Sequence, residues 1–193
     1  MITGILLAAG YATRFGGNKL MHEIHSVPMG VLSARNMSAA LTHVVAVVHT
    51  GDELLRQKFL AENIQVVVCD NANEGMGASL ACGVRAAQDA DGWVIALGDM
   101  PFIQSETISE VAEQIAHGAV IVAPKYSGTR GHPVGFIKQF GPELMALRGD
   151  AGASSESGTV YPSGASRNSA PVARRWSTHE STSGSGVSAS STW

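Results

Sequence analysis

Two cationic side chains follow a run of small residues near the start of the chain. Ala8, Ala9 and Gly10 come directly after an apolar stretch, and Arg14 and Lys19 follow soon after them. Small residues let a ligand approach the backbone, whose successive N–H groups can bind phosphate oxygens. A guanidinium can bind phosphate in a bidentate manner, and an ammonium supplies a point charge. The pattern predicts a phosphate-binding loop; the alternative is an ordinary strand-to-helix connection with two surface cations.

The spacing in this loop differs from that of a P-loop. GxxxxGK[ST] is absent, because Lys19 is followed by Leu20 rather than by a hydroxyl residue. A second glycine-rich stretch, Gly75-Met76-Gly77-Ala78-Ser79-Leu80, lacks the last glycine of the dinucleotide-binding pattern. Neither stretch identifies a nucleotide-binding family by itself.

A carboxylate follows a strongly apolar run later in the chain. The run ends in Leu97-Gly98, and Asp99, Met100 and Pro101 come next. Ligands of open α/β sheets bind at the carboxyl ends of strands, and a carboxylate at that edge can bind Mg²⁺ together with phosphate oxygens. We therefore predict that Asp99 is a magnesium ligand; the alternative is that it caps the following turn.

These residues need a sheet to bring them together, and the hydrophobic pattern predicts one. Several apolar runs are continuous rather than alternating, which is typical of parallel strands buried on both faces. Segments with helical spacing lie between them, so the chain predicts βαβ units and a Rossmann-like, doubly wound, mostly parallel α/β sheet. The expected strands are 4–9, 44–48, 64–69, 93–97 and 120–123, and the expected helices are 28–40, 52–62, 79–90 and 105–117.

Composition narrows the class of protein. The chain has 193 residues, of which 45% are hydrophobic and 15% charged, and its net charge is −3. These values suit one globular domain and do not favour a nucleic acid or an anionic membrane as a partner. Cys69 and Cys82 form neither a CxxC pair nor a zinc spacing, which favours free thiols in a cytoplasmic protein. The apolar start of the chain runs straight into the small-residue loop, so we expect a strand there rather than a signal peptide.

The last part of the chain has a different composition. Of the 43 residues from 151 to 193, 13 are serine, and the apolar periodicity ends. Such a composition predicts a loosely packed segment. We expect a domain over residues 1–153 and a Ser/Gly-rich tail over 154–193.

Four motifs in order resemble the MobA-like nucleotidyltransferase superfamily, with the molybdenum cofactor cytidylyltransferases as the most similar branch. The loop reads Leu-Ala-Ala-Gly, where the guanylyltransferase branch usually has Leu-Ala-Gly-Gly. The other three motifs are two stretches typical of the cytidylyl branch and the Leu-Gly-Asp-Met-Pro stretch. The motifs are residues 7–20, 75–81, 97–101 and 130–136, and residues 147–153 follow in the same pattern.

The resemblance implies a fold of the nucleotide-diphospho-sugar transferase type and a role for each motif. Leu7, Ala8, Ala9 and Gly10, with Arg14 and Lys19, would hold the triphosphate of CTP, and Asp99 would hold Mg²⁺. Gly75, Gly77 and Ser79 would lie by the base and ribose, and His132 would face the acceptor. The implied acceptor is molybdopterin or its molybdenum-loaded form, and a molybdenum enzyme or its maturation chaperone is a candidate delivery partner.

One departure from the family pattern bears on activity. Ser177 stands where the family carries a second metal-binding carboxylate, so either Asp150 or Glu180 assists or metal binding is weakened. Three hypotheses follow: a cytidylyltransferase, a relative that uses another base or phosphorylated acceptor (GTP and molybdopterin included), or a protein that binds the cofactor without chemistry.

Overall fold

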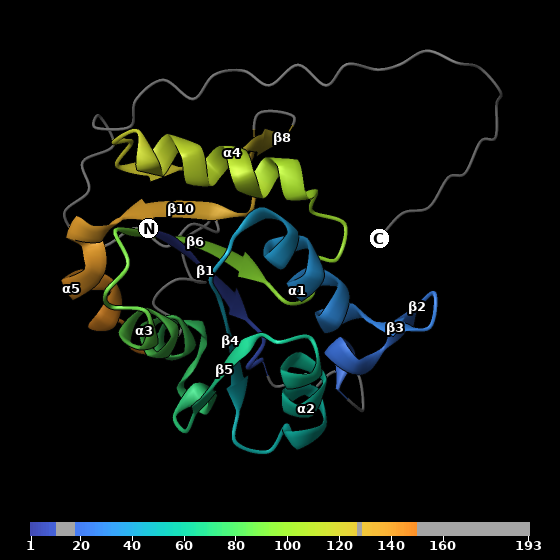
Figure 1. Ribbon diagram of the computed structural model, residues 1–193. Helices are drawn as coiled ribbons and strands as arrows, with labels where there is room; N and C mark the ends of the chain where they lie inside the picture. Colours follow the sequence, from blue (N-terminus) through green and yellow to red (C-terminus); the bar gives the residue numbers. More distant parts are fainter. Residues whose placement is uncertain (11–17, 127–128, 150–193) are drawn as a thin grey trace, which may run out of the picture.

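The computed structural model describes residues 1–10, 18–126 and 129–149. Its centre is a six-stranded sheet in the order β5-β4-β1-β6-β10-β7 (Figure 1). The first four of these strands run parallel, and β10 runs antiparallel to both β6 and β7. The strands are β1 (Ile2–Leu7), β4 (Val44–His49), β5 (Gln65–Cys69), β6 (Gly92–Leu97), β7 (Ile121–Val122) and β10 (Val134–Ile137).

Helices cover both faces of this sheet (Figure 1). On one face α1, α2 and α4 pack over the alternate strand residues Leu6, Val94 and Ala96. On the other face α3 and α5 pack over Ile5 and Ile95. The helices are α1 (Met29–Ala40), α2 (Glu53–Ala61), α3 (Met76–Ala86), α4 (Ser105–Ala116) and α5 (Gly141–Met145). Successive strand residues thus face two separate cores, which explains the continuous apolar runs and confirms the predicted doubly wound α/β fold.

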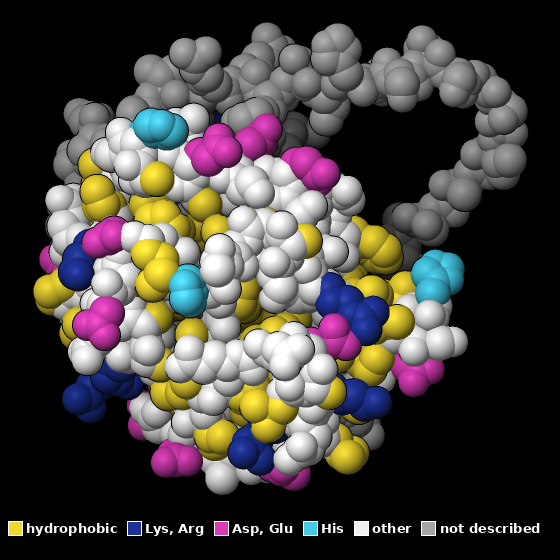
Figure 2. Space-filling view, in the orientation of Figure 1, with side chains coloured by type: hydrophobic (Ala, Val, Ile, Leu, Met, Phe, Trp, Pro, Cys, Tyr) yellow, Lys and Arg dark blue, Asp and Glu magenta, His cyan; other side chains and the backbone are white. Residues whose placement is uncertain are grey.

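Short elements complete the described chain. Three 3₁₀ turns lie between the main elements, and two small antiparallel hairpins lie outside the central sheet. They are η1 (Lys19–Met21), η2 (Ala72–Glu74), η3 (Lys138–Phe140), β2 (Glu23–Ile24) with β3 (Val27–Pro28), and β8 (Lys125–Tyr126) with β9 (Thr129–Arg130). On the face shown in Figure 2, acidic and basic side chains are interspersed over the described surface. Across the described ranges, none of the helices combines the length and the apolarity needed to cross a bilayer.

The structure corrects two of the predicted elements and adds a strand. Helix α3 begins at Met76 rather than at Ser79, and the predicted strand 120–123 shortens to the two residues of β7. Strand β10 was not predicted from the apolar pattern, because Gly135 interrupts a run of only four residues. A side chain at Gly135 would meet Ile115 Cγ1 at 2.7 Å and Val111 Cγ1 at 2.8 Å. The glycine therefore allows α4 to pack closely on β10.

The strand order creates a crevice at one edge of the sheet. From β1 the chain proceeds outward to β4 and β5, and it then returns to place β6 on the other side of β1. Helix α1, which follows β1, lies on one face of the sheet, whereas α3, which leads into β6, lies on the other face. The strand order therefore reverses beside β1, and a space lies at the carboxyl ends of β1 and β6. Open α/β sheets bind ligands at this kind of switch point.

Candidate active site

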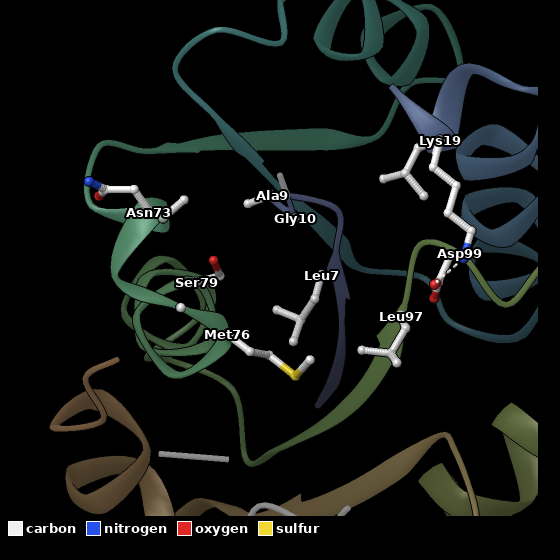
Figure 3. Close-up of a pocket in the computed structure, with 12 residues that line it drawn as sticks. Leu7, Ala9, Gly10, Lys19, Asn73, Met76, Ser79, Leu97 and Asp99 are labelled. Atoms are coloured by element: carbon white, nitrogen blue, oxygen red, sulfur yellow. Dashed lines mark hydrogen bonds and ion pairs between the residues drawn. The ribbon is translucent and has the colours of Figure 1, made fainter. Parts of the chain in front are cut away.

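A pocket of about 440 Å³ lies at the carboxyl ends of β1 and β6. In the close-up of Figure 3, the end of β1 forms its floor, α3 one wall, and the segments after β1 and β6 the other. Seven residues that were predicted from the sequence line it: Leu7, Ala9, Gly10, Lys19, Gly75, Ser79 and Asp99. The structure therefore brings three of the four sequence motifs to one cavity.

Lys19 and Asp99 meet across one wall of this pocket. Lys19 Nζ lies 2.9 Å from Asp99 Oδ2, and the side chains are 36% and 39% exposed (Figure 3). Lys19 opens the turn η1, and Asp99 follows β6 by two residues. A cation and an anion thus stand together at the mouth of the pocket, where both can reach a bound ligand.

The turn that carries Lys19 is held by local hydrogen bonds. Asn18 caps η1, because its side-chain oxygen accepts a hydrogen bond from the N–H of Leu20 at 3.1 Å. The amide of Asn18 also donates to the buried carboxylate of Asp52. Asp52 in turn caps α2 by accepting from the N–H of Leu55 at 3.4 Å. These contacts hold the start of η1, and with it the Lys19 backbone, against the N-terminus of α2.

The opposite wall is the first turn of α3. Gly75, at a φ of 131°, precedes the helix, and its lack of a Cβ makes that conformation accessible. The hydroxyl of Ser79 points into the cavity, although the residue is only 4% exposed (Figure 3). A buried hydroxyl at a pocket wall can donate a hydrogen bond to a ligand and accept one from it.

Two of the predicted residues, Ala8 and Gly77, are buried and do not line the pocket. Ala8 is buried below the floor, where its N–H donates to Val47 O at 2.9 Å. Gly77 packs against the end of the described chain: its N–H donates to Gly149 O at 2.9 Å, and a Cβ on it would lie 2.8 Å from that oxygen. Arg14 lies outside the described residues, as do Ser177 and the predicted tail 154–193.

His132 lies close to the pocket but does not line it. It stands two residues before Val134, which pairs with Ile95, so the antiparallel register carries it toward the carboxyl end of β6. Its Nδ1 is buried and has no hydrogen-bond partner among the described residues. Burial lowers the pKa of the His132 ring, and the negative charge of Asp99 and the backbone of Ile95 oppose that shift. The ring is thus set near the acid of the site in a poorly hydrated place.

Sequence reasoning did not single out five of the residues that line the pocket. Leu20 and Met76 stand inside quoted motifs, and Leu97 directly precedes Gly98-Asp99, so proximity in the chain was the available signal. Ala72 and Asn73 belong to η2, and nothing in their sequence context indicated a ligand.

The donor set suits a magnesium ion that is shared with a substrate. Asp99 is the one acid among the residues described as lining the pocket. Within residues 1–10, 18–126 and 129–149 no group of three His, Cys, Asp or Glu side chains could enclose a metal. Mg²⁺ is commonly held by one or two carboxylates with waters and substrate phosphates, so a single carboxylate beside a phosphate-sized space fits that ion.

Comparison with known proteins gives a consistent result. Residues 4–160 match the family described as the MobA-like NTP transferase domain. Purine catabolism protein PucB of Bacillus subtilis (strain 168) is 30% identical over 162 residues, which are 79% of this chain and 78% of PucB. Nicotine blue oxidoreductase of Paenarthrobacter nicotinovorans is 28% identical over 162 residues, 79% of each protein.

The fold also has solved relatives. The crystal structure of Rv0371c from Mycobacterium tuberculosis H37Rv superposes with a TM-score of 0.71 at 25% identity, covering 79% of both chains. A second structure of Rv0371c is a complex with manganese, with a TM-score of 0.63 at 24% identity over the same shares.

Proposed function

The chain belongs to the MobA-like NTP transferase family, and from that premise we propose that it transfers CMP from CTP to molybdopterin. In this reaction the acceptor phosphate attacks the α-phosphorus of CTP. The bond between the α-phosphorus and the bridging oxygen breaks, and pyrophosphate leaves. The products are the cytosine dinucleotide form of the cofactor and pyrophosphate, and the ion required is Mg²⁺.

The observation that carries the proposal is the pairing of Lys19 with Asp99 at the mouth of a pocket at the β1/β6 switch point. Phosphoryl chemistry places charge on the phosphate oxygens in the transition state, so catalysis depends on positioning and on charge neutralisation. Lys19 supplies a positive charge to the triphosphate. Asp99 supplies the carboxylate for Mg²⁺, which, when bound, neutralises phosphate charge and orients the leaving group.

The acceptor needs no strong base. A phosphate monoester has a second pKa of about 6, so it is mostly dianionic at pH 7 and already nucleophilic. The residues of the site therefore have to hold the two substrates in line rather than remove a proton. We propose that the hydroxyl of Ser79 and the backbone around Gly75, both in the pocket lining, contact the nucleoside. We propose that His132, which the strand register carries toward the carboxyl end of β6, faces the acceptor.

The choice of CTP and of molybdopterin is supported by the sequence motifs alone. The Leu-Ala-Ala-Gly loop and the stretch 75–81 resemble the cytidylyl branch, and residues 130–136 resemble its acceptor motif. The use of a divalent ion is supported by Asp99, the one carboxylate among the described residues that line the pocket. Rv0371c, a relative in fold, has been crystallised with manganese.

The test is a pyrophosphate-release assay with purified full-length protein, Mg²⁺ and molybdopterin, run separately with CTP, GTP, ATP and UTP. We expect release with CTP, and we expect Asp99→Ala to reduce it by roughly 100-fold or more, the loss typical of removing a transition-state charge contact. Asp89→Ala is the matched control, because Asp89 is exposed and precedes β6 at the opposite edge of the sheet.

The other outcomes separate the remaining hypotheses. Selective release with GTP would replace the cytidylyl assignment with a guanylyl one. Nucleotide binding without release in the presence of acceptor would indicate a cofactor-binding protein.

A further inference from the structure

Helix α1 contacts the turn that carries Asp99 through two polar side chains. Ser33 Oγ donates to the carbonyl of Gly98 at 2.8 Å, and Asn36 Nδ2 donates to the carbonyl of Pro101 at 2.8 Å. The first acceptor immediately precedes Asp99 and the second follows it by two residues. The turn is therefore held on both sides of the carboxylate by donors one helical turn apart, on one face of the helix.

Helix stability does not account for these two residues. Serine and asparagine are weak helix formers, because their side chains compete for backbone hydrogen bonds. Ser33 is only 4% exposed, and Val31, Ala34 and Met37 of the same helix are buried apolar residues. A buried hydroxyl among apolar neighbours has to be hydrogen-bonded, and the shorter of its two bonds, to Gly98 rather than to Met29 at 3.2 Å, crosses to the site.

The same helix also supports the turn that carries Lys19. A Cβ on Gly30 would lie 3.2 Å from Leu55 Cδ1 and 3.3 Å from Leu20 Cβ, both tighter than usual, so the glycine eases the close packing of η1 on α1. Both members of the Lys19–Asp99 pair are thus set by contacts to one rigid element. A catalytic group needs such support, since small misplacements cost large factors in rate.

We propose that Ser33 and Asn36 are positioning residues that hold the Gly98–Pro101 turn, and with it the Asp99 carboxylate, in the orientation required for metal binding. The inference rests on the metal role of Asp99 in the proposed function. Neither side chain lines the pocket, so both act through the backbone of the turn.

The first measurement concerns the turn itself and requires no ligand. Met100 N–H donates to Leu97 O at 3.3 Å, and Ile103 N–H donates to Met100 O at 3.4 Å. Amide hydrogen exchange at these two positions is compared in wild type, Ser33→Ala and Asn36→Asp, the last an isosteric change that removes the donor. We expect exchange to accelerate about fivefold in each variant, the factor equivalent to one ordinary hydrogen bond.

The second measurement is the affinity for Mn²⁺ alone, followed by electron paramagnetic resonance. We expect Ser33→Ala and Asn36→Asp to weaken it severalfold at a temperature where both variants are fully folded. Ser33→Thr, which keeps the hydroxyl, restores it. Ser38→Ala is the matched control, because Ser38 is exposed on the same helix. If the two side chains only stabilised the fold, the melting temperature would fall while the affinity of the folded protein for Mn²⁺ stayed the same.

The possible failures are distinguishable. Unchanged amide exchange at Met100 and Ile103 in both variants would overturn the inference, as would unchanged Mn²⁺ affinity alongside faster exchange. If the wild type binds no Mn²⁺, the metal role of Asp99 in the proposed function fails; faster exchange in the variants would then still support the hold on the turn.

Discussion

Lys19 and a metal ion compete for the same carboxylate when no nucleotide is bound. Lys19 Nζ lies 2.9 Å from Asp99 Oδ2, so a cation that binds Asp99 has to displace the ammonium or share the carboxylate with it. Lys19→Ala therefore has two effects of opposite sign. It strengthens the binding of Mn²⁺ alone, because the competitor is removed, and it weakens the binding of CTP, because the phosphates lose a positive charge.

The magnitude follows from the exposure of the pair. At 2.9 Å two unit charges in bulk water attract by about 1.4 kcal/mol by Coulomb's law, and the costs of desolvating and ordering the two side chains offset part of this attraction. Both side chains are more than a third exposed, and exposed ion pairs contribute about 0.2–1 kcal/mol when measured. The expected gain in Mn²⁺ affinity is thus about 1.4- to 5-fold. The loss in CTP affinity is roughly 10-fold or more, since hydrogen bonds to charged groups contribute about 1.5–3 kcal/mol.

The assay is a titration of Mn²⁺ followed by electron paramagnetic resonance, and a calorimetric titration of CTP with Mg²⁺. Lys58→Ala is the matched control, because Lys58 is an exposed lysine in the last turn of α2. A higher salt concentration is expected to reduce the difference in Mn²⁺ affinity between wild type and Lys19→Ala, because salt screens exposed ion pairs. Weaker Mn²⁺ binding by Lys19→Ala, or unchanged CTP affinity, would refute the reasoning.

Three further predictions concern pH, thiol reactivity and packing. Burial lowers the pKa of His132 below its usual 6.5, so below that pH the unfolded chain binds a proton more tightly than the folded chain does. The free energy of unfolding therefore falls as the pH drops from 6.5 toward the pKa of the folded state. Urea unfolding at pH 7 and pH 5 should show a smaller loss in His132→Phe, and an equal loss would contradict the prediction. Burial and the neighbouring Cys82 raise the pKa of the Cys69 thiol to about 11, so iodoacetamide at pH 8 should label Cys82 before Cys69. Peptide mass spectrometry measures the labelling, and equal labelling of the two cysteines would contradict this prediction. Gly77→Ala places a methyl 2.8 Å from Gly149 O and should cost about 1–3 kcal/mol of stability in urea unfolding. Gly10→Ala should cost little, because no atom of the described residues lies within 4 Å of its added Cβ.

The sequence predicted the framework because the framework depends on local patterns. Apolar runs such as 44–48 and 93–97 can be buried on both faces only as inner strands, and they fold within a residue or two of the predicted bounds. The small-residue loop and Asp99 each come directly after such a run. Their placement at one edge of the sheet followed from the rule that parallel strands end on the same side.

Other features depended on packing between elements that are distant in the chain. Gly77 resembled part of a ligand loop, but it lies within α3, where its missing side chain admits the backbone of Gly149. Strand β10 gave too short a pattern, because close packing under α4 required a glycine at its centre. Sequence patterns report which face of an element is apolar, but not which partner approaches it or how closely.

The sequence by itself determined the fold class, the family resemblance and the residue types available for chemistry. Only the tertiary structure decided that Lys19 and Asp99, 80 residues apart, lie within hydrogen-bond distance. It also decided that Ser33 and Asn36 of α1 donate hydrogen bonds to the Gly98–Pro101 turn that follows β6. The physical reason is that secondary structure arises from short-range periodicity in side-chain polarity. The geometry of a site depends instead on how rigid elements pack against one another, and no short stretch of sequence encodes that packing.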